Sequence, residues 1–233
     1  MLPAQPNASL MDGVTCLQAL ATADAPVGVR ELARRLGMET TRVNRLLKTL
    51  AHIGMARQTA GRKYVPGPGM HVLSAQSLHA SGLIRRALPA LEALGPLGCT
   101  VALGVLWRDS VCYLYHAIPG MPPEAALGRV GVFPAAQSGI GLALLAAMGD
   151  DEVRALYAAR PPAGGIESLL EKLAEVRRDG YAFVQTRHRP RTVTLAVGVG
   201  DPPYAAVALA GDISARSVPR LAKLLRDAAG KMA

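Results

Sequence analysis

Apolar residues in the first fifty or so positions recur at helical spacing and predict three short helices. The first begins near Ser9, a residue type that favours helix starts, and "APVG" at 25–28 interrupts the pattern. Gly37 is expected to end the second helix. The apolar positions that share a face are Leu10, Val14, Leu17, Leu20 and Ala21, then Val29, Leu32, Ala33 and Leu36, then Val43, Leu46, Leu47 and Leu50. Two helices joined by a tight glycine turn match the helix-turn-helix layout.

A short basic hairpin is predicted directly after the third helix. In "MARQTAGRKYVPG", extended runs at 56–58 and 63–65 flank the turn "TAGR". A hairpin in this position is the wing of a winged helix-turn-helix. Residues 1–68 are therefore predicted to form a winged helix-turn-helix domain.

The remainder of the chain mixes helical and strand patterns. A helical stretch from 70 to 93 is broken at Gly82, so 69–81 is assigned as a linker helix and 82–233 as a second domain. There "CTVALGVLW" and "VCYLYHAI" predict a hairpin around "RDS". Further helices are expected at 139–148, 151–159, 166–179 and 214–232, and further strands at 182–186, 192–199 and 204–210. This mixture predicts an α+β fold with helices packed on a mainly antiparallel sheet.

Charge and composition point to a folded protein with a polyanionic partner. The chain has 233 residues, 50% hydrophobic content and a formal net charge of +9. Residues 1–70 hold nine Lys and Arg against four Asp and Glu, which makes this segment the more basic one per residue. Three cysteines without metal-ligand spacing, and no signal-peptide pattern or membrane-length apolar run, lead us to expect a soluble, cytoplasmic protein.

The cationic residues around the third helix form a candidate DNA-binding surface. Arg can read guanine and Asn can read adenine in the major groove, whereas Lys and Arg elsewhere hold phosphates. The alternative is a solvated cationic face of a helical bundle, but the glycine turn and the basic hairpin, in this order, favour DNA. The candidate contacts are Arg34, Thr40, Thr41, Arg42, Asn44, Arg45, Lys48, Arg57, Arg62 and Lys63.

Four stretches of the chain resemble the IclR (isocitrate lyase regulator) family of bacterial transcription factors. They are "LARRLGMETTRVNRLLKTLAHIGMARQTAGRKYVPG", "FPAAQSGIGLALLAAM", "LAEVRRDGYAF" and "YAAVALAGDIS". The resemblance implies a winged helix-turn-helix followed by an effector-binding domain with a GAF-like sheet. It also implies that the chain forms dimers, or dimers of dimers, on double-stranded operator DNA, and that the helix near 70–80 helps to pair two winged domains.

The segment "AAQSGIGLALLAA" raises the alternative of an enzyme, because Ser138 stands beside glycines. A nucleophile elbow needs Gly-x-Ser-x-Gly, however, and no Asp and His pair with Ser138 at a recognisable spacing. The segment is better explained as a helix start capped by Ser138. The resemblance adds that the backbone amides of Gly139 and Ile140 help to bind the effector.

The remaining effector residues implied by the resemblance depart from the family pattern. Val184 stands where an acid occurs in some members, Thr194 where a cysteine is common, and Ala208 and Ala210 replace polar side chains. An apolar cavity with one carboxylate-binding end suits an aromatic or medium-chain organic acid. The basic run Arg187–Arg191, which contains His188, is interpreted as a solvated loop rather than as an effector contact.

These observations predict a ligand-responsive transcriptional regulator that performs no chemistry and uses no metal or cofactor. Its expected partners are operator DNA, a small carboxylate effector and further copies of the same chain. Two alternatives stay open: an enzyme-like sensor domain carrying a DNA-binding head, and a purely structural sensor domain in the same place. The sequence does not choose between a dimer and a tetramer.

Overall fold

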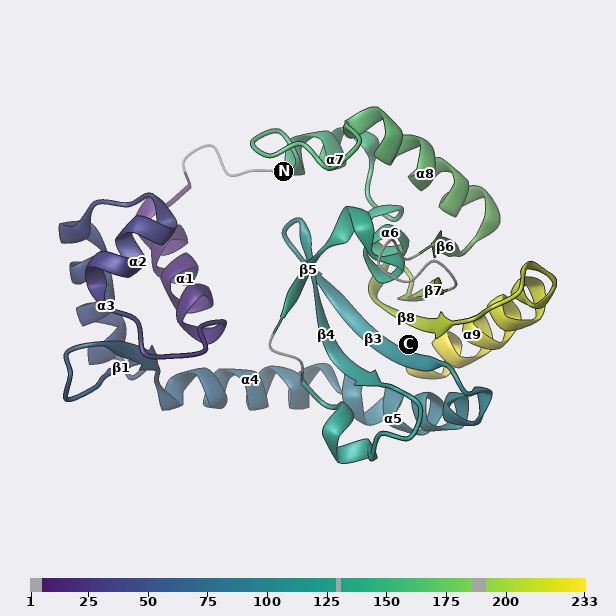
Figure 1. Ribbon diagram of the computed structural model, residues 1–233, viewed down its shortest axis with the longest axis horizontal. Coiled ribbons are helices and arrows are strands. Elements are labelled where there is room, and N and C mark those ends of the chain that lie inside the picture. The colour runs from purple at the N-terminus through teal and green to yellow at the C-terminus, as the bar shows by residue number, and fades with distance from the viewer. Residues whose placement is uncertain (1–5, 129–130, 186–191) are drawn as a thin grey trace. The chain divides into compact units, whose positions relative to one another are not determined.

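The computed structural model describes residues 6–128, 131–185 and 192–233. The chain divides into two compact units, Met1–Ser81 and Gly82–Ala233. The first unit is mainly helical and the second contains a six-stranded sheet covered by helices (Figure 1). The predicted α+β class, with an amino-terminal helix-turn-helix region, is confirmed.

The first unit contains the predicted three helices and hairpin. Its elements are α1 (Ala8–Ala21), α2 (Val29–Leu36), α3 (Thr40–His52), β1 (Ala56–Gln58), β2 (Tyr64–Pro66) and α4 (Pro68–Ser81). Gly37 ends α2 in the left-handed conformation, with φ of 65°, which a residue with a side chain rarely adopts. The buried side chains of Leu32, Val43, Leu47 and Tyr64 join the three helices to the hairpin.

The predicted cap of α1 was wrong by two residues. The side chain of Asn7 accepts a hydrogen bond from the Leu10 N–H at 3.0 Å, and Ser9 lies inside the first turn. Asn and Ser are equally good caps, so the residue types alone do not choose between the two positions.

The start of α4 is fixed to the end of α3 through the backbone. The N–H of Gly69 donates to the carbonyl of Gly54, and that of Gly67 donates to the carbonyl of Met55, both at 2.9 Å. A Cβ added to Gly67 would lie 2.3 Å from the Gly54 oxygen, so only glycine permits this approach. Beyond this junction, none of the α4 residues is buried.

The second unit is built around one antiparallel sheet with strand order β5-β4-β3-β8-β7-β6. Its strands are β3 (Thr100–Trp107), β4 (Ser110–Ala117), β5 (Val132–Pro134), β6 (Ala182–Gln185), β7 (Val193–Gly200) and β8 (Pro203–Gly211). Its helices are α5 (Leu83–Leu94), α6 (Gly139–Leu145), α7 (Asp150–Leu156), α8 (Ile166–Asp179) and α9 (Val218–Met232). The short strand β5 was not predicted, because three exposed residues carry no alternating pattern.

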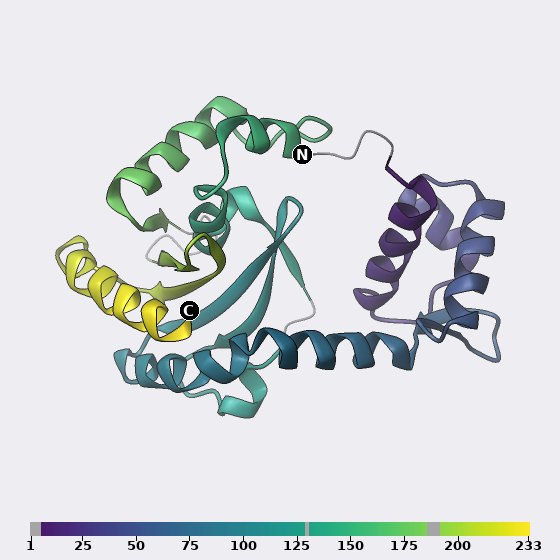
Figure 2. The same ribbon diagram turned by 180° about the vertical axis from the view of Figure 1, so that it is seen from behind.

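The two faces of the sheet carry side chains of different size. Leu103, Leu195 and Leu209 lie on the face that packs against α5 and α9. Ala102, Ala196, Ala206 and Ala208 lie on the opposite face, which is covered by α6 and, farther out, by α8 (Figure 2). Small side chains let α6 approach the sheet so closely that all seven of its residues are buried.

Helix α6 ends three residues earlier than the sequence predicts. The side chain of Arg177 on α8 donates to the carbonyl oxygens of Ala146 at 2.8 Å and Met148 at 2.9 Å. It also donates to Asp150 at 2.8 Å, at the start of α7. These bonds satisfy carbonyls that a longer α6 would have used, so one guanidinium stabilises the turn between α6 and α7.

Candidate DNA interface and effector site

Helix α3 presents its polar residues outward because its apolar ridge is fully used in the core. Val43, Leu47 and Leu50 are buried against α1, α2 and the hairpin. The remaining candidate residues of this helix are exposed, except Asn44, which is half-buried. The exposed candidates on α3 are Thr40, Thr41, Arg42, Arg45 and Lys48.

Most candidate cations in the first unit carry uncompensated charge. Among the residues that the structure describes, no carboxylate forms an ion pair with Arg34, Arg45, Lys48, Arg57, Arg62 or Lys63. Arg42 is different, because its Nη2 lies 2.6 Å from Oδ2 of Asp12 on α1. On α2, Arg35 is paired with Glu31 one turn earlier. The surface is therefore cationic mainly at α3 and at the hairpin.

The hairpin carries one candidate cation, Arg57, on β1 and two, Arg62 and Lys63, at its tight turn. The N–H of Thr59 donates to the Lys63 carbonyl at 2.7 Å, and that of Arg62 donates to the Thr59 carbonyl at 3.0 Å. Arg62 adopts a positive φ of 57°, an uncommon conformation for a residue with a side chain. Arg57, Arg62 and Lys63 are all exposed. Exposed charges on such a hairpin are suited to contact phosphates.

In the second unit, Ser138 is the predicted cap of α6. Its Oγ accepts a hydrogen bond from the Gly141 N–H at 3.4 Å. The same Oγ lies 3.3 Å from the hydroxyl of Tyr113 on β4. The hydroxyl of Ser138 therefore stabilises a helix start, as expected from the sequence.

The sheet aligns three of the predicted effector residues in one row. Val184 on β6 is opposite Thr194 on β7, which is opposite Ala210 on β8. Thr194 also meets the start of α6, since a Cβ added to Gly139 would lie 2.7 Å from the Thr194 methyl carbon. These four residues are therefore neighbours in space.

The other two predicted effector residues belong to the packed core. Ala208 lies in the next row of the same face, opposite Ala196, and is 2% exposed. The side chain of Ile140 is 1% exposed and packs toward Gly104 on β3. Only the backbone amide of Ile140 is left for the role that the resemblance implies.

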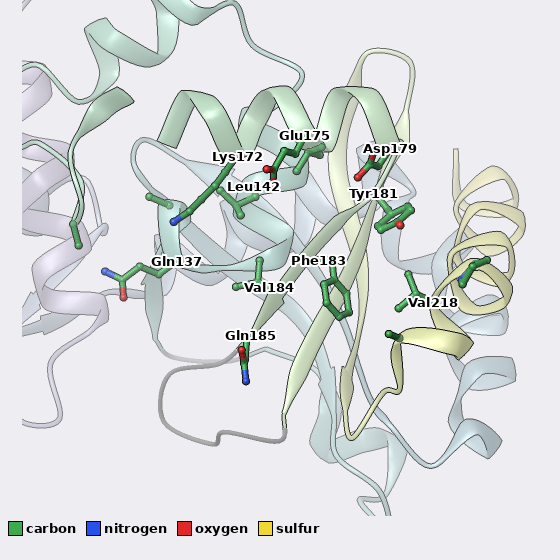
Figure 3. A pocket seen from close by; sticks show the side chains of 15 residues that line it. Gln137, Leu142, Lys172, Glu175, Asp179, Tyr181, Phe183, Val184, Gln185 and Val218 are labelled. Atoms are coloured by element: carbon green, nitrogen blue, oxygen red, sulfur yellow. The ribbon is translucent and has the colours of Figure 1, made fainter. Parts of the chain in front are cut away.

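A cavity of about 650 Å³ lies at the free edge of β6 (Figure 3). Val184 is the one predicted effector residue that lines it, together with Gln137 and Leu142 near the start of α6. Lys172 and Glu175 of α8 form its polar side, and Phe183 is exposed in its centre. This volume is typical of small-molecule sites. The sequence did not reveal this cavity, because three distant segments build it.

An aromatic cluster lies next to the cap of α6. The ring of Tyr113 meets those of Phe133 and His116 edge-on, with centroid distances of 5.1 Å and 5.6 Å. The basic run Arg187–Arg191, including His188, lies outside the described residues.

Two kinds of feature are absent from the described ranges 6–128, 131–185 and 192–233. Within them, no three metal-ligating side chains come together. No helix there is long and apolar enough to cross a bilayer. Burial is the main cause that raises the pKa of the thiols of Cys16, Cys99 and Cys112, so these thiols are less nucleophilic than free cysteine.

Two family models match the chain in the same order as its two structural units. The IclR helix-turn-helix domain matches residues 9–60, and the bacterial transcriptional regulator IclR C-terminal domain matches residues 75–233. The transcriptional regulator KdgR of Dickeya chrysanthemi is 31% identical over 195 residues, which are 79% of this chain and 63% of that protein.

Solved structures share the fold at lower identity. An IclR-family transcriptional regulator from Brucella abortus superimposes with a TM-score of 0.79 at 22% identity, covering 100% of this chain and 93% of that one. An IclR homologue from Microbacterium hydrocarbonoxydans, complexed with 4-hydroxybenzoate, has a TM-score of 0.71 at 20% identity and covers 97% of both chains. With its helix-turn-helix, its antiparallel sheet and both family models in place, the chain belongs to the IclR family of bacterial transcriptional regulators.

Proposed function

We propose that this protein regulates transcription by binding operator DNA through α3 and the hairpin, under the control of a small organic acid. The observation that carries the proposal is the set of exposed, unpaired cations on α3 and the hairpin. A solvated bundle does not need so many exposed cations without a carboxylate partner, whereas cations placed against phosphates bind them and release counterions.

In this proposal α3 enters the major groove. Thr41, Asn44 and Arg45 lie early on the helix and would meet base edges, whereas Lys48 would meet a phosphate. Arg57, Arg62 and Lys63 on the hairpin would hold the neighbouring backbone, and Arg34 on α2 would hold the backbone on the other side. Thr40, at the first position of α3, can donate its hydroxyl to a phosphate.

A second copy of the chain would cover the apolar surface of α4. This helix is fourteen residues long, has no charged residue, and exposes Val72, Leu73 and Leu78. Leu73 also lines a largely apolar hollow between α1 and α3, with Leu10 and Ile53. An exposed helix without charges is unusual for a solvated element. A dimer would cover this surface and would place two copies of α3 on two half-sites.

The effector would be an organic acid bound at the start of α6. Ser138, Gly139 and Ile140 would offer backbone and hydroxyl groups to its carboxylate. Its apolar body would occupy the cavity lined by Leu142, Val184 and Phe183. Thr194 and Ala210 would form the floor, and Ala208 would support it. The relative complexed with 4-hydroxybenzoate supports an aromatic acid as the ligand class.

Such a ligand acts by binding one arrangement of the dimer more tightly than another. The distribution between the two arrangements then shifts by the difference in affinity, and the affinity for the operator shifts with it. Ser138 has the role of a helix cap in this scheme, and no catalytic step is proposed.

Selection of duplexes from a randomised library tests the proposal directly. The wild-type protein should enrich one sequence of two related half-sites, and its affinity for that duplex should fall steeply as salt rises. Adding 4-hydroxybenzoate, benzoate or hexanoate should change the affinity for the selected duplex. Failure to enrich any sequence would contradict the proposed function.

A further inference from the structure

The ion pair between Asp12 and Arg42 joins the first helix of the chain to the helix proposed to enter the groove. Nη2 of Arg42 lies 2.6 Å from Oδ2 of Asp12. Arg42 stands in the first turn of α3, whereas Asp12 lies in the middle of α1. Among the described cations of α3 and the hairpin, Arg42 is the one whose charge is paired. The sequence pattern placed Arg42 among the candidate DNA contacts and indicated no role for Asp12.

Asp12 and Arg42 lie on helices that pack against each other in the core of the first unit. Gly13, next to Asp12, is buried, and a Cβ added there would meet the side chain of Leu46 at 3.9 Å. Asp12 and Arg42 are therefore carried by elements whose packing in the core fixes their spacing. The side chain of Asp12 is 25% exposed and that of Arg42 is 45% exposed.

Stability alone does not account for this pair. Ion pairs between partly exposed side chains contribute little to folding, because water screens them and ordering long side chains is unfavourable. Ordering the side chain of Arg42 has a different effect. Its Nη2 lies against Asp12, and a guanidinium has five N–H donors in a fixed plane, so donors are left for a second acceptor. Contact with Asp12 limits the orientations that these donors can adopt.

We propose that Asp12 is a positioning residue for DNA recognition, which orients the guanidinium of Arg42 so that its free N–H groups meet a base edge or phosphate at the start of α3. This inference rests on the proposed entry of α3 into the groove. An arginine that is already ordered loses less conformational entropy on binding, and a fixed plane suits the paired acceptors of guanine. Asp12 would thus contribute to specificity without contacting DNA.

A plain electrostatic role for Asp12 makes the opposite prediction. If the carboxylate only neutralised Arg42, removing it would strengthen binding to every duplex by a similar factor, because one more cation would face the phosphates. If it positions Arg42, removing it should weaken binding to the selected sequence and leave binding to other sequences unchanged or stronger. The ratio of the two affinities separates these roles.

The experiment measures that ratio by fluorescence anisotropy with the full chain. The two probes are the duplex that the wild-type protein selects from a randomised library and a scrambled duplex of the same composition. For Asp12→Asn we expect the ratio to fall by about five- to tenfold. Asp12→Glu keeps the carboxylate and should recover part of the ratio. In an Arg42→Ala background, Asp12→Asn should have no further effect on the ratio.

Two controls separate the possible failures. Glu31→Gln breaks the pair with Arg35 on α2 and should leave the ratio unchanged. Arg45→Ala tests whether α3 itself contributes to the ratio of the two affinities. If Arg45→Ala lowers the ratio and Asp12→Asn does not, the positioning role of Asp12 is wrong while the proposed function stands. If the wild-type protein selects no sequence, the proposed function fails first. Equal strengthening of both duplexes by Asp12→Asn would also overturn the positioning role.

Discussion

Thr194 on β7 packs directly against the backbone of Gly139 at the start of α6. A Cβ on Gly139 would lie 2.7 Å from the Thr194 methyl carbon, which is closer than two such carbons approach in proteins. The start of α6 and the row of Val184, Thr194 and Ala210 therefore form one packed unit. The position of this helix start depends on the lack of a side chain at Gly139 and on the size of Thr194.

Gly139→Ala should lower the free energy of unfolding by about 1–3 kcal/mol, because the new methyl group overlaps with Thr194. Thr194→Ser removes the opposing methyl and should restore part of the loss when the two are combined. Urea denaturation of the two single variants and the double variant measures this coupling. Strictly additive effects would show that the two residues do not compete for space.

Arg45→Ala and Lys48→Ala should weaken DNA binding in different ways. Because Arg45 is a proposed base contact, Arg45→Ala should weaken binding to the selected duplex by about 1–3 kcal/mol and relax the sequence preference at one position. Because Lys48 is a proposed phosphate contact, Lys48→Ala should weaken binding to all duplexes alike. It should also reduce the slope of log K against log salt by about 1. Anisotropy titrations at several salt concentrations measure both effects. The same response from both variants would remove the distinction between the two roles.

Leu73→Glu should dissociate the proposed dimer, because it places a charge in the surface that a second copy would cover. Sedimentation at several protein concentrations would show the monomer. Ala75→Glu, on the same helix but outside the hollow between α1 and α3, is the matched control and should perturb assembly less. A wild-type protein that is monomeric at every concentration tested would rule out the pairing.

Arg177→Ala should lower the free energy of unfolding by about 1–3 kcal/mol, since it removes three hydrogen bonds between α8 and the turn after α6. Arg178→Ala is the control. Arg178 is exposed and, among the residues that the structure describes, pairs with the adjacent Asp179, so its loss should change the free energy of unfolding far less. Equal losses in the two variants would mean that the carbonyl contacts of Arg177 add nothing to stability.

Local patterns predicted the helix-turn-helix and most of the sheet, because periodic burial is a property of neighbouring residues. The ridge of Val43, Leu47 and Leu50 could be read from the sequence, and the structure buries it. The antiparallel hairpin of β3 and β4 followed from two apolar runs around a turn. Both features need only short-range information.

Features that depend on distant segments could not be predicted. The pair of Asp12 and Arg42 is set by how α1 crosses α3, and nothing in either segment alone indicates it. The cavity at β6 combines the approach to α6 with α8 and an edge strand. The contacts of Arg177 shorten α6 from outside that helix. In each case a tertiary partner decides what the local pattern leaves open.

The junction of Gly54 with Gly67 and Gly69 has a mechanical consequence. Gly54 follows the last turn of α3, and the backbone bonds at this junction anchor the first turn of α4 to it. Because the backbones touch directly at these glycines, the two helices have little freedom to move relative to each other. A rotation of α4 at its distal end would therefore be transmitted through this junction and would reorient α3.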